Sequence, residues 1–137
     1  MTHSAISLQE AIHAALLASA GLIESLNGPH VYDDVPMTRK PPYVVFAEAR
    51  HLDWSTSGEA GNEHLVTLQV WSRKRGRREV LEISDHILEA LAQVPDQIGD
   101  HALVNLRHEF TDVEQDEASG LFVASINLRV VTEPSSN

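Results

Sequence analysis

A strand, a basic turn and a helix follow one another between Glu63 and Ala92, and this succession constrains the fold more than any other feature. From Glu63 to Ser72 apolar and polar residues alternate, which is the period of a strand with one buried face. From Glu79 to about Ala92 the apolar residues recur at helical spacing and form one stripe. Because both elements are one-sided, the sequence predicts a helix packed on one face of a sheet.

The turn between the strand and the helix concentrates positive charge. It contains five of the ten basic residues of the chain, namely Arg73, Lys74, Arg75, Arg77 and Arg78. The chain also has 20 acidic residues and a net charge of −10, so the turn projects from an acidic body. Such asymmetry favours self-association, because unlike surfaces of two copies attract one another. Three interpretations stay open: a solvated turn, a contact with a protein partner and a contact with nucleic acid.

Composition limits the class of protein. A length of 137 residues predicts one domain covering 1–137, with a flexible tail at 134–137. The absence of cysteine excludes disulfides and thiolate metal sites. No apolar run approaches the ~20 residues that span a bilayer, and the N-terminus lacks the pattern of a secretory signal. The acidic balance argues against sequence-specific DNA binding, although it permits DNA to pass through a channel without sticking.

The remaining pattern completes an α+β fold. Ser7 and Glu10 have the form of a capping box and begin a helix that Asn27-Gly28-Pro29 ends. Extended segments are expected at Val31-Tyr32, Tyr43 to about Trp54, Leu103–Val113 and Leu121 to about Glu133. We therefore expect a four-stranded, mostly antiparallel sheet made of two hairpins, with two helices covering one face.

Two regions are candidates for contacts with other subunits or partners. The loop Ser55–Asn62 joins two long strands and should protrude as a hairpin. The face of the sheet without helices should carry polar residues and a tryptophan, and together with exposed sheet edges this suits association with other subunits. The candidate interface residues are Arg73, Lys74, Arg75, Arg77, Arg78, Trp71, Trp54, Gly58 and Glu59.

Catalytic and metal patterns are weak. Among eight histidines, the best constellation is Glu48, His51, Asp53 and His64, which could meet across a hairpin; the alternative is that these residues are solvated near its tip. The carboxylates at Asp33-Asp34 and between Asp112 and Glu117 fit solvated turns. There is no nucleophile elbow, Walker loop or dinucleotide fingerprint. We assign no catalytic, metal-binding or cofactor-binding residue, and expect no cofactor.

Three segments occur in a characteristic order: Val31-Tyr32-Asp33-Asp34-Val35-Pro36, then Pro42-Tyr43-Val44-Val45, then the strand His64–Ser72. A turn containing Gly76, an apolar helical stripe and a strand finishing near Glu133 follow. In this order they resemble the small tail-completion, or tail-terminator, proteins of long-tailed bacteriophages, which also occur in prophages and gene transfer agents. The resemblance covers nearly the whole chain, from the first helix to Glu133.

The resemblance implies a structural protein without catalytic activity. Such proteins assemble as a ring, usually of six, that caps the head-proximal end of the tail tube. The implied partners are further copies of the chain, the major tail tube protein and the head-tail connector or stopper protein, with DNA passing through the lumen and no membrane involved. The implied location is the tail of a virion or phage-like particle assembled in the bacterial cytoplasm. Two alternatives stay open: a monomeric head-tail adaptor or assembly factor, and a small metal-dependent enzyme.

Overall fold

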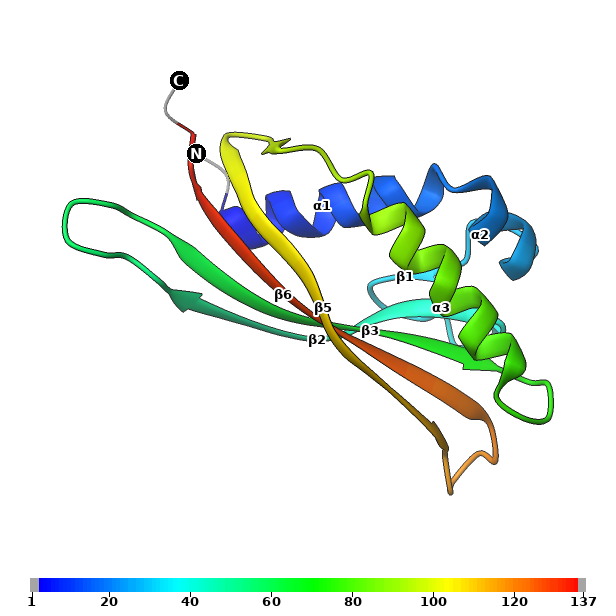
Figure 1. Ribbon diagram of the computed structural model, residues 1–137. Helices are drawn as coiled ribbons and strands as arrows, with labels where there is room; N and C mark the ends of the chain where they lie inside the picture. The colour runs from blue at the N-terminus through cyan, green and yellow to red at the C-terminus, as the bar shows by residue number, and fades with distance from the viewer. Residues whose placement is uncertain (1–2, 136–137) are drawn as a thin grey trace.

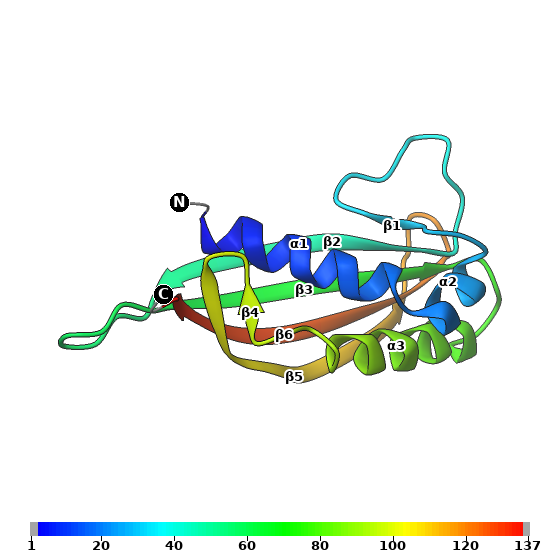
Figure 2. The same ribbon diagram turned by 90° about the horizontal axis from the view of Figure 1, so that it is seen from above.

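In the computed structural model, which describes residues 3–135, one twisted sheet carries helices on one face (Figure 1). The helices are α1 (Ser4–Leu17), α2 (Ala20–Leu26) and α3 (Arg78–Leu91). The strands are β1 (Val31–Tyr32), β2 (Tyr43–Asp53), β3 (Asn62–Ser72), β4 (Gln97–Ile98), β5 (His101–Gln115) and β6 (Phe122–Pro134). Figure 2 shows the helices lying along the strands and the β2–β3 hairpin extending beyond them.

The sheet is larger than expected. The α+β class is confirmed, but the sheet has six strands in the order β1-β2-β3-β6-β5-β4 rather than four. The two expected hairpins, β2–β3 and β5–β6, are joined through the antiparallel β3–β6 pair. At the two edges, β1 pairs parallel with β2, and β4 pairs antiparallel with β5. Strands as short as β1 and β4 have no hydrophobic period to detect, which is why the sequence did not reveal them as members of the sheet.

The expected N-terminal helix is two helices, bent by 79° between Leu17 and Ala20. Ser19 begins α2, because its hydroxyl accepts a hydrogen bond from the backbone N–H of Leu22 at 3.2 Å. Asn27 ends α2 with a positive φ of 59°, as the sequence predicted. Among the described residues no single helix could cross a membrane by length and hydropathy; α1 and α2 meet that test only as a bent pair.

The capping-box prediction for Ser7 is wrong. The helix begins one turn earlier, where the imidazole of His3 accepts a hydrogen bond from the N–H of Ala5 at 3.0 Å. Ser7 is buried inside α1 and packs against the turn at Gly99, whose Cβ, if it had one, would lie 3.0 Å from the Ser7 hydroxyl. Ser7 therefore contributes to tertiary packing and does not cap the helix, although the local sequence pattern fits a cap.

Strand β3 shows how the core forms. Val66, Leu68 and Val70 are buried under the helices, whereas the intervening Thr67 and Gln69 are half-buried on the opposite face. The helices add a matching stripe of buried residues, namely Leu8, Ile12, Leu16, Leu22, Val80, Ile83 and Ile87. The predicted division of the strand into two faces is confirmed. The face of the sheet without helices is called the open face below.

The C-terminal end of the chain is held more closely than a tail would be. Strand β6 extends to Pro134, and the N–H of Ser135 donates a hydrogen bond to the carbonyl of Asp100 at 3.1 Å. The last two positions of the expected flexible tail, 136 and 137, lie outside the described residues.

Candidate interface surfaces

The basic turn, residues 73–78, connects β3 to α3 and is exposed. Gly76 has a φ of 87°, a conformation that favours glycine and closes the turn. Lys74 pairs with Glu79 at 3.4 Å, and Arg78 pairs with Glu82 at 2.7 Å. Arg77 lies over the ring of Phe122, with 5.6 Å to the ring centroid. Two of the five charges are thus matched by glutamates of α3.

Arg73 and Arg75 differ from their neighbours. Both side chains are exposed, and neither forms an ion pair within residues 3–135. Glu79, four residues after Arg75, is engaged by Lys74 and by the hydroxyl of Ser72 instead. These two arginines are therefore the part of the basic turn most available to a partner.

The hairpin loop, residues 54–61, contains the second group of candidates. Trp54 is 50% exposed, and the guanidinium of Arg129 lies over its ring, with 5.6 Å to the centroid. Thr56 and Glu59 exchange backbone hydrogen bonds of 2.8 and 3.0 Å around Gly58, which has a φ of 86°. The loop is a formed turn that exposes a tryptophan and a glutamate.

The structure places these two groups of candidates at opposite ends of β3. The hairpin loop precedes Asn62 and the basic turn follows Ser72, so about 33 Å of extended strand separates them at roughly 3.3 Å per residue. Trp71 belongs to the basic-turn end and donates its indole N–H to Gln69 at 3.3 Å on the open face. The candidate residues therefore form two separate surfaces rather than one.

An acidic segment lies near the basic turn. Ser72 pairs with Phe122 across the β3–β6 ladder, and Phe122 pairs with Gln115 across the β5–β6 ladder. The β5–β6 turn, with the carboxylates of Asp112, Glu114, Asp116 and Glu117, is thus at the same end of the sheet as the basic turn. The acidic residues of the β5–β6 turn therefore reduce the net positive charge at the end of the sheet that carries the basic turn.

Polar contacts tie the open face together. Thr67 donates to Asn127 at 2.8 Å, and Gln69 donates to Ser125 at 3.2 Å, each across the β3–β6 pair. Arg129 forms an ion pair with Glu63 on the same face. These residues satisfy one another within the subunit, so the centre of the open face has few unused polar groups to offer a ligand.

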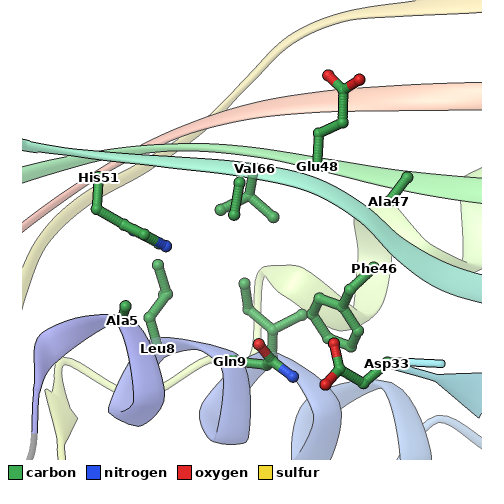
Figure 3. A pocket seen from close by; sticks show the side chains of 11 residues that line it. Ala5, Leu8, Gln9, Asp33, Phe46, Ala47, Glu48, His51 and Val66 are labelled. Atoms are coloured by element: carbon green, nitrogen blue, oxygen red, sulfur yellow. The ribbon is translucent and has the colours of Figure 1, made fainter.

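The proposed metal constellation does not assemble. His51 and His64 meet with 2.7 Å between their Nδ1 atoms, and the buried His64 also bonds the hydroxyl of Thr132 at 2.8 Å. Glu48 points to the opposite side of β2 from His51 (Figure 3). Asp53 accepts hydrogen bonds from Ser55 instead. Within residues 3–135 no three histidine, aspartate or glutamate side chains are placed to share a metal ion.

Burial lowers the pKa of His64 to about 4, with further contributions from the neighbouring His51, His3 and His101. Burial and His3 also lower the pKa of His51. The lowered pKa values keep His51 and His64 neutral at physiological pH. Glu48, His51 and Asp53 are exposed, as the solvated alternative predicted, but His64 is fully buried, so that alternative is wrong for His64.

Hollows open beside both edges of the sheet. One, of about 210 Å³, lies between α1 and β2 and is lined by Leu8, Ile12, Phe46 and Ala49 among others (Figure 3). The other, of about 230 Å³, lies beside β5 and is lined by Leu88, Leu91, Ala92, Leu106, His108 and Leu128. The lining of the first hollow also includes the ionisable residues Asp33, Glu48 and His51, of which Glu48 points to the opposite side of β2 from His51 (Figure 3).

The sequence predicted that exposed sheet edges suit association, but it did not show which strands form them. Leu52 on β2 is 41% exposed, and Val104 and Phe110 on β5 are 54% and 53% exposed. Isolated exposed apolar residues are ordinary, but these three lie along the two outermost long strands. In the sequence, each of these residues is an apolar residue on the polar side of its strand. That feature indicates a contact surface only once the strand order shows that the strand lies at an edge.

Comparison with known proteins agrees with this architecture. Residues 10–133 match the model of the family described as "Tail completion protein gp17". The fold is similar to that of a chain in the virion of a native gene transfer agent (GTA) particle, with a TM-score of 0.83, 23% identity, and coverage of 97% of this chain and 99% of that chain. At this identity the likeness shows a shared fold. No curated protein matches the sequence significantly.

Proposed function

The chain belongs to the tail completion protein gp17 family, and from that premise we propose that it forms a ring closing the head-proximal end of a phage-like tail tube. As a member of this family it is a structural protein of a phage-like tail. In the proposed role, copies of the chain surround the tube opening, stop tube growth and join the tube to the head-tail connector. A hexamer, through which DNA passes without specific contacts, is the proposed form of the ring.

One observation carries the proposal beyond the family. The exposed candidate surfaces lie at opposite ends of the long strand β3: the hairpin loop at one end and the basic turn at the other. A ring between a tube and a connector needs two different contact surfaces on opposite sides. We assign the hairpin loop to the tube, because it extends beyond the helices, and the basic turn to the connector (Figure 2).

The site geometry favours assembly over chemistry. The hollow beside β5 is lined mostly by apolar residues, and at the hollow between α1 and β2 the Glu48 and His51 side chains point to opposite sides of β2. An acidic chain with a net charge of −10 also repels DNA, which suits a ring through which DNA slides. Both points support a structural role.

Removal of the gene from its particle tests the function. We expect tails of irregular and excessive length that fail to join heads, together with loss of DNA delivery, and normal particles after complementation with the intact gene. Tails of normal length joined to heads in the deletion strain would contradict the proposal. Tails of normal length that fail to join heads would favour the alternative of a head-tail adaptor.

Charge reversal tests the assignment of the two ends. The double variant Arg73→Glu/Arg75→Glu should leave tail length normal and reduce joining to heads, because these arginines have no internal partner to lose. Lys40→Glu, an exposed change in the loop between β1 and β2, is the matched control. Equal head joining in the double variant and the control would refute the role of the basic turn.

A further inference from the structure

The two outermost long strands of the sheet have free edges. Strand β1 pairs only with Val44 and Val45, so the edge of β2 from Phe46 to Asp53 has no neighbour in the described chain. Strand β4 pairs only with His101 and Ala102, so the edge of β5 beyond Leu103 is also open within residues 3–135. Free edges of this length are templates for pairing with another strand.

The directions of the strands make the two edges compatible. Strand β2 is antiparallel to β3, β3 to β6 and β6 to β5, so β2 and β5 run in opposite directions. Copies related by rotation about an axis along the strands keep these directions. The β5 edge of one copy therefore meets the β2 edge of the next as an antiparallel pair, which continues the hydrogen-bond pattern of the sheet.

The two free segments also lie at the same level. Glu48 pairs with Thr67, Thr67 with Asn127, and Asn127 with Phe110. Likewise, Leu52 is connected through Glu63 and Val131 to Asn105. The free part of β2 in one copy therefore lies at the same height along the strand axis as the free part of β5 in the neighbouring copy. The short strands β1 and β4 cover the opposite ends of their partners and leave this level open.

From these observations we propose that the subunits join edge to edge, the free β2 segment Phe46–Asp53 of one copy pairing with the free β5 segment of a second copy of the same chain. This inference rests on the proposed ring and identifies its subunit contact. The contact is heterologous, since two different edges meet, and heterologous contacts close into rings when the rotation permits.

Charge selects the register. With the strands at equal level, Arg50 faces Arg107, because Arg50 is connected to Arg107 through Leu65 and Arg129. Like charges directly opposite are unfavourable. A stagger of about two residues, of the kind that closed sheets require, places Glu48 opposite Arg107 instead. Arg107 is available because its contact with Glu109, at 3.2 Å, is an exposed pair on its own strand.

Apolar surface is covered in the same arrangement. The hollow between α1 and β2 and the hollow beside β5 both open at the edges that would meet. In the staggered register Leu106 of one copy lies beside Ala49 of the next, at the mouth of the hollow lined by Leu8 and Phe46. Exposed Val104 and Leu52 lie on the two edges that meet, so the apolar residues on both edges lose contact with water.

Disulfide trapping tests the contact, and the chain has no cysteine to interfere. The variant Glu48→Cys/Arg107→Cys should form a ladder of covalent oligomers when rings on purified tail tubes are oxidised, because opposed strand residues lie within disulfide reach. Glu48→Cys/Glu114→Cys is the control pair: it uses the same edges, but Glu114 is about 20 Å further along β5 and should not cross-link.

Charge reversal gives an independent measurement. Glu48→Arg and Arg107→Glu should each weaken ring formation about tenfold, and the double reversal should restore it, because opposite charges across strands attract and like charges repel. Rings that form normally but yield no ladder and no rescue would overturn the edge contact while leaving the proposed function intact. A ladder of open chains without tube capping would support the contact and contradict the capping function.

Discussion

The buried His64 predicts how the stability of the subunit depends on pH. His64 is fully buried, and its pKa is lowered from 6.5 to about 4 by burial and by the adjacent His51, His3 and His101. A lowered pKa means that the folded state binds protons less well than the unfolded state. Stability from this group is therefore fully present above pH 6.5 and is lost as the pH falls through that value toward 4.

The size of this loss follows from the pKa values. Each tenfold change in proton affinity is worth about 1.4 kcal/mol. The change in pKa from 6.5 to about 4 therefore lowers the unfolding free energy by about 3 kcal/mol once His64 is fully protonated. His64→Leu/Thr132→Val removes the imidazole together with the buried hydroxyl that bonds it, and the other partner of His64, His51, is exposed to solvent. The double variant should keep its stability over this pH range better than the natural sequence.

Urea unfolding of the monomer between pH 4.5 and 8, followed by tryptophan fluorescence, measures the effect. The unfolding free energy of the natural chain should fall more steeply below pH 6.5 than that of the double variant, and His108→Gln, which changes an exposed histidine, should follow the natural chain. Parallel pH profiles for all three proteins would refute the reasoning. An NMR titration of His64 in the natural chain gives a second measurement, and a pKa near 6.5 would refute it equally.

Three further predictions concern packing, capping and the hairpin loop. Ile12→Ala should lower the unfolding free energy by about 2–5 kcal/mol, whereas Ile6→Ala in the same helix should change it little, because Ile12 is buried and Ile6 is 53% exposed; equal losses by chemical denaturation would contradict the assigned helix face. Ser19→Ala should cost about 1 kcal/mol by losing the cap of α2, and thermal unfolding that matches the natural chain would argue against that cap. Trp54→Ser should weaken tube capping without changing the secondary structure seen by circular dichroism, and unchanged capping in an electron-microscopy count would remove Trp54 from the tube contact.

Much of the fold could be predicted from local pattern. The alternation of Val66, Leu68 and Val70 identified both the strand and its buried face, and the stripe through Val80, Ile83 and Ile87 identified the helix that covers it. In these segments local propensity and tertiary packing agree. At Ser7 they disagree, because a serine that fits a capping box is used to pack α1 against the turn at Gly99.

The interface could not be predicted in the same way. Which strands lie at the edges depends on the pairing of β3 with β6, a contact between residues about 60 positions apart that no local period encodes. For that reason the sequence identified the charged turn and the flexible loop, whose residues stand out by composition, and it predicted exposed sheet edges without showing that β2 and β5 provide them. In the sequence, the hairpin loop and the basic turn also appeared as one set of interface candidates. Only the extended conformation of β3 shows how far apart they lie.

The location of the protein on the tail tests the central claim most directly. Purified tail tubes would be mixed with the chain carrying a gold-binding tag at its C-terminus and imaged by electron microscopy. We predict one compact group of labels at one end of each tube, at the end that joins the head in intact particles. Labels along the tube wall, at the opposite end, or absent from tubes would contradict the account.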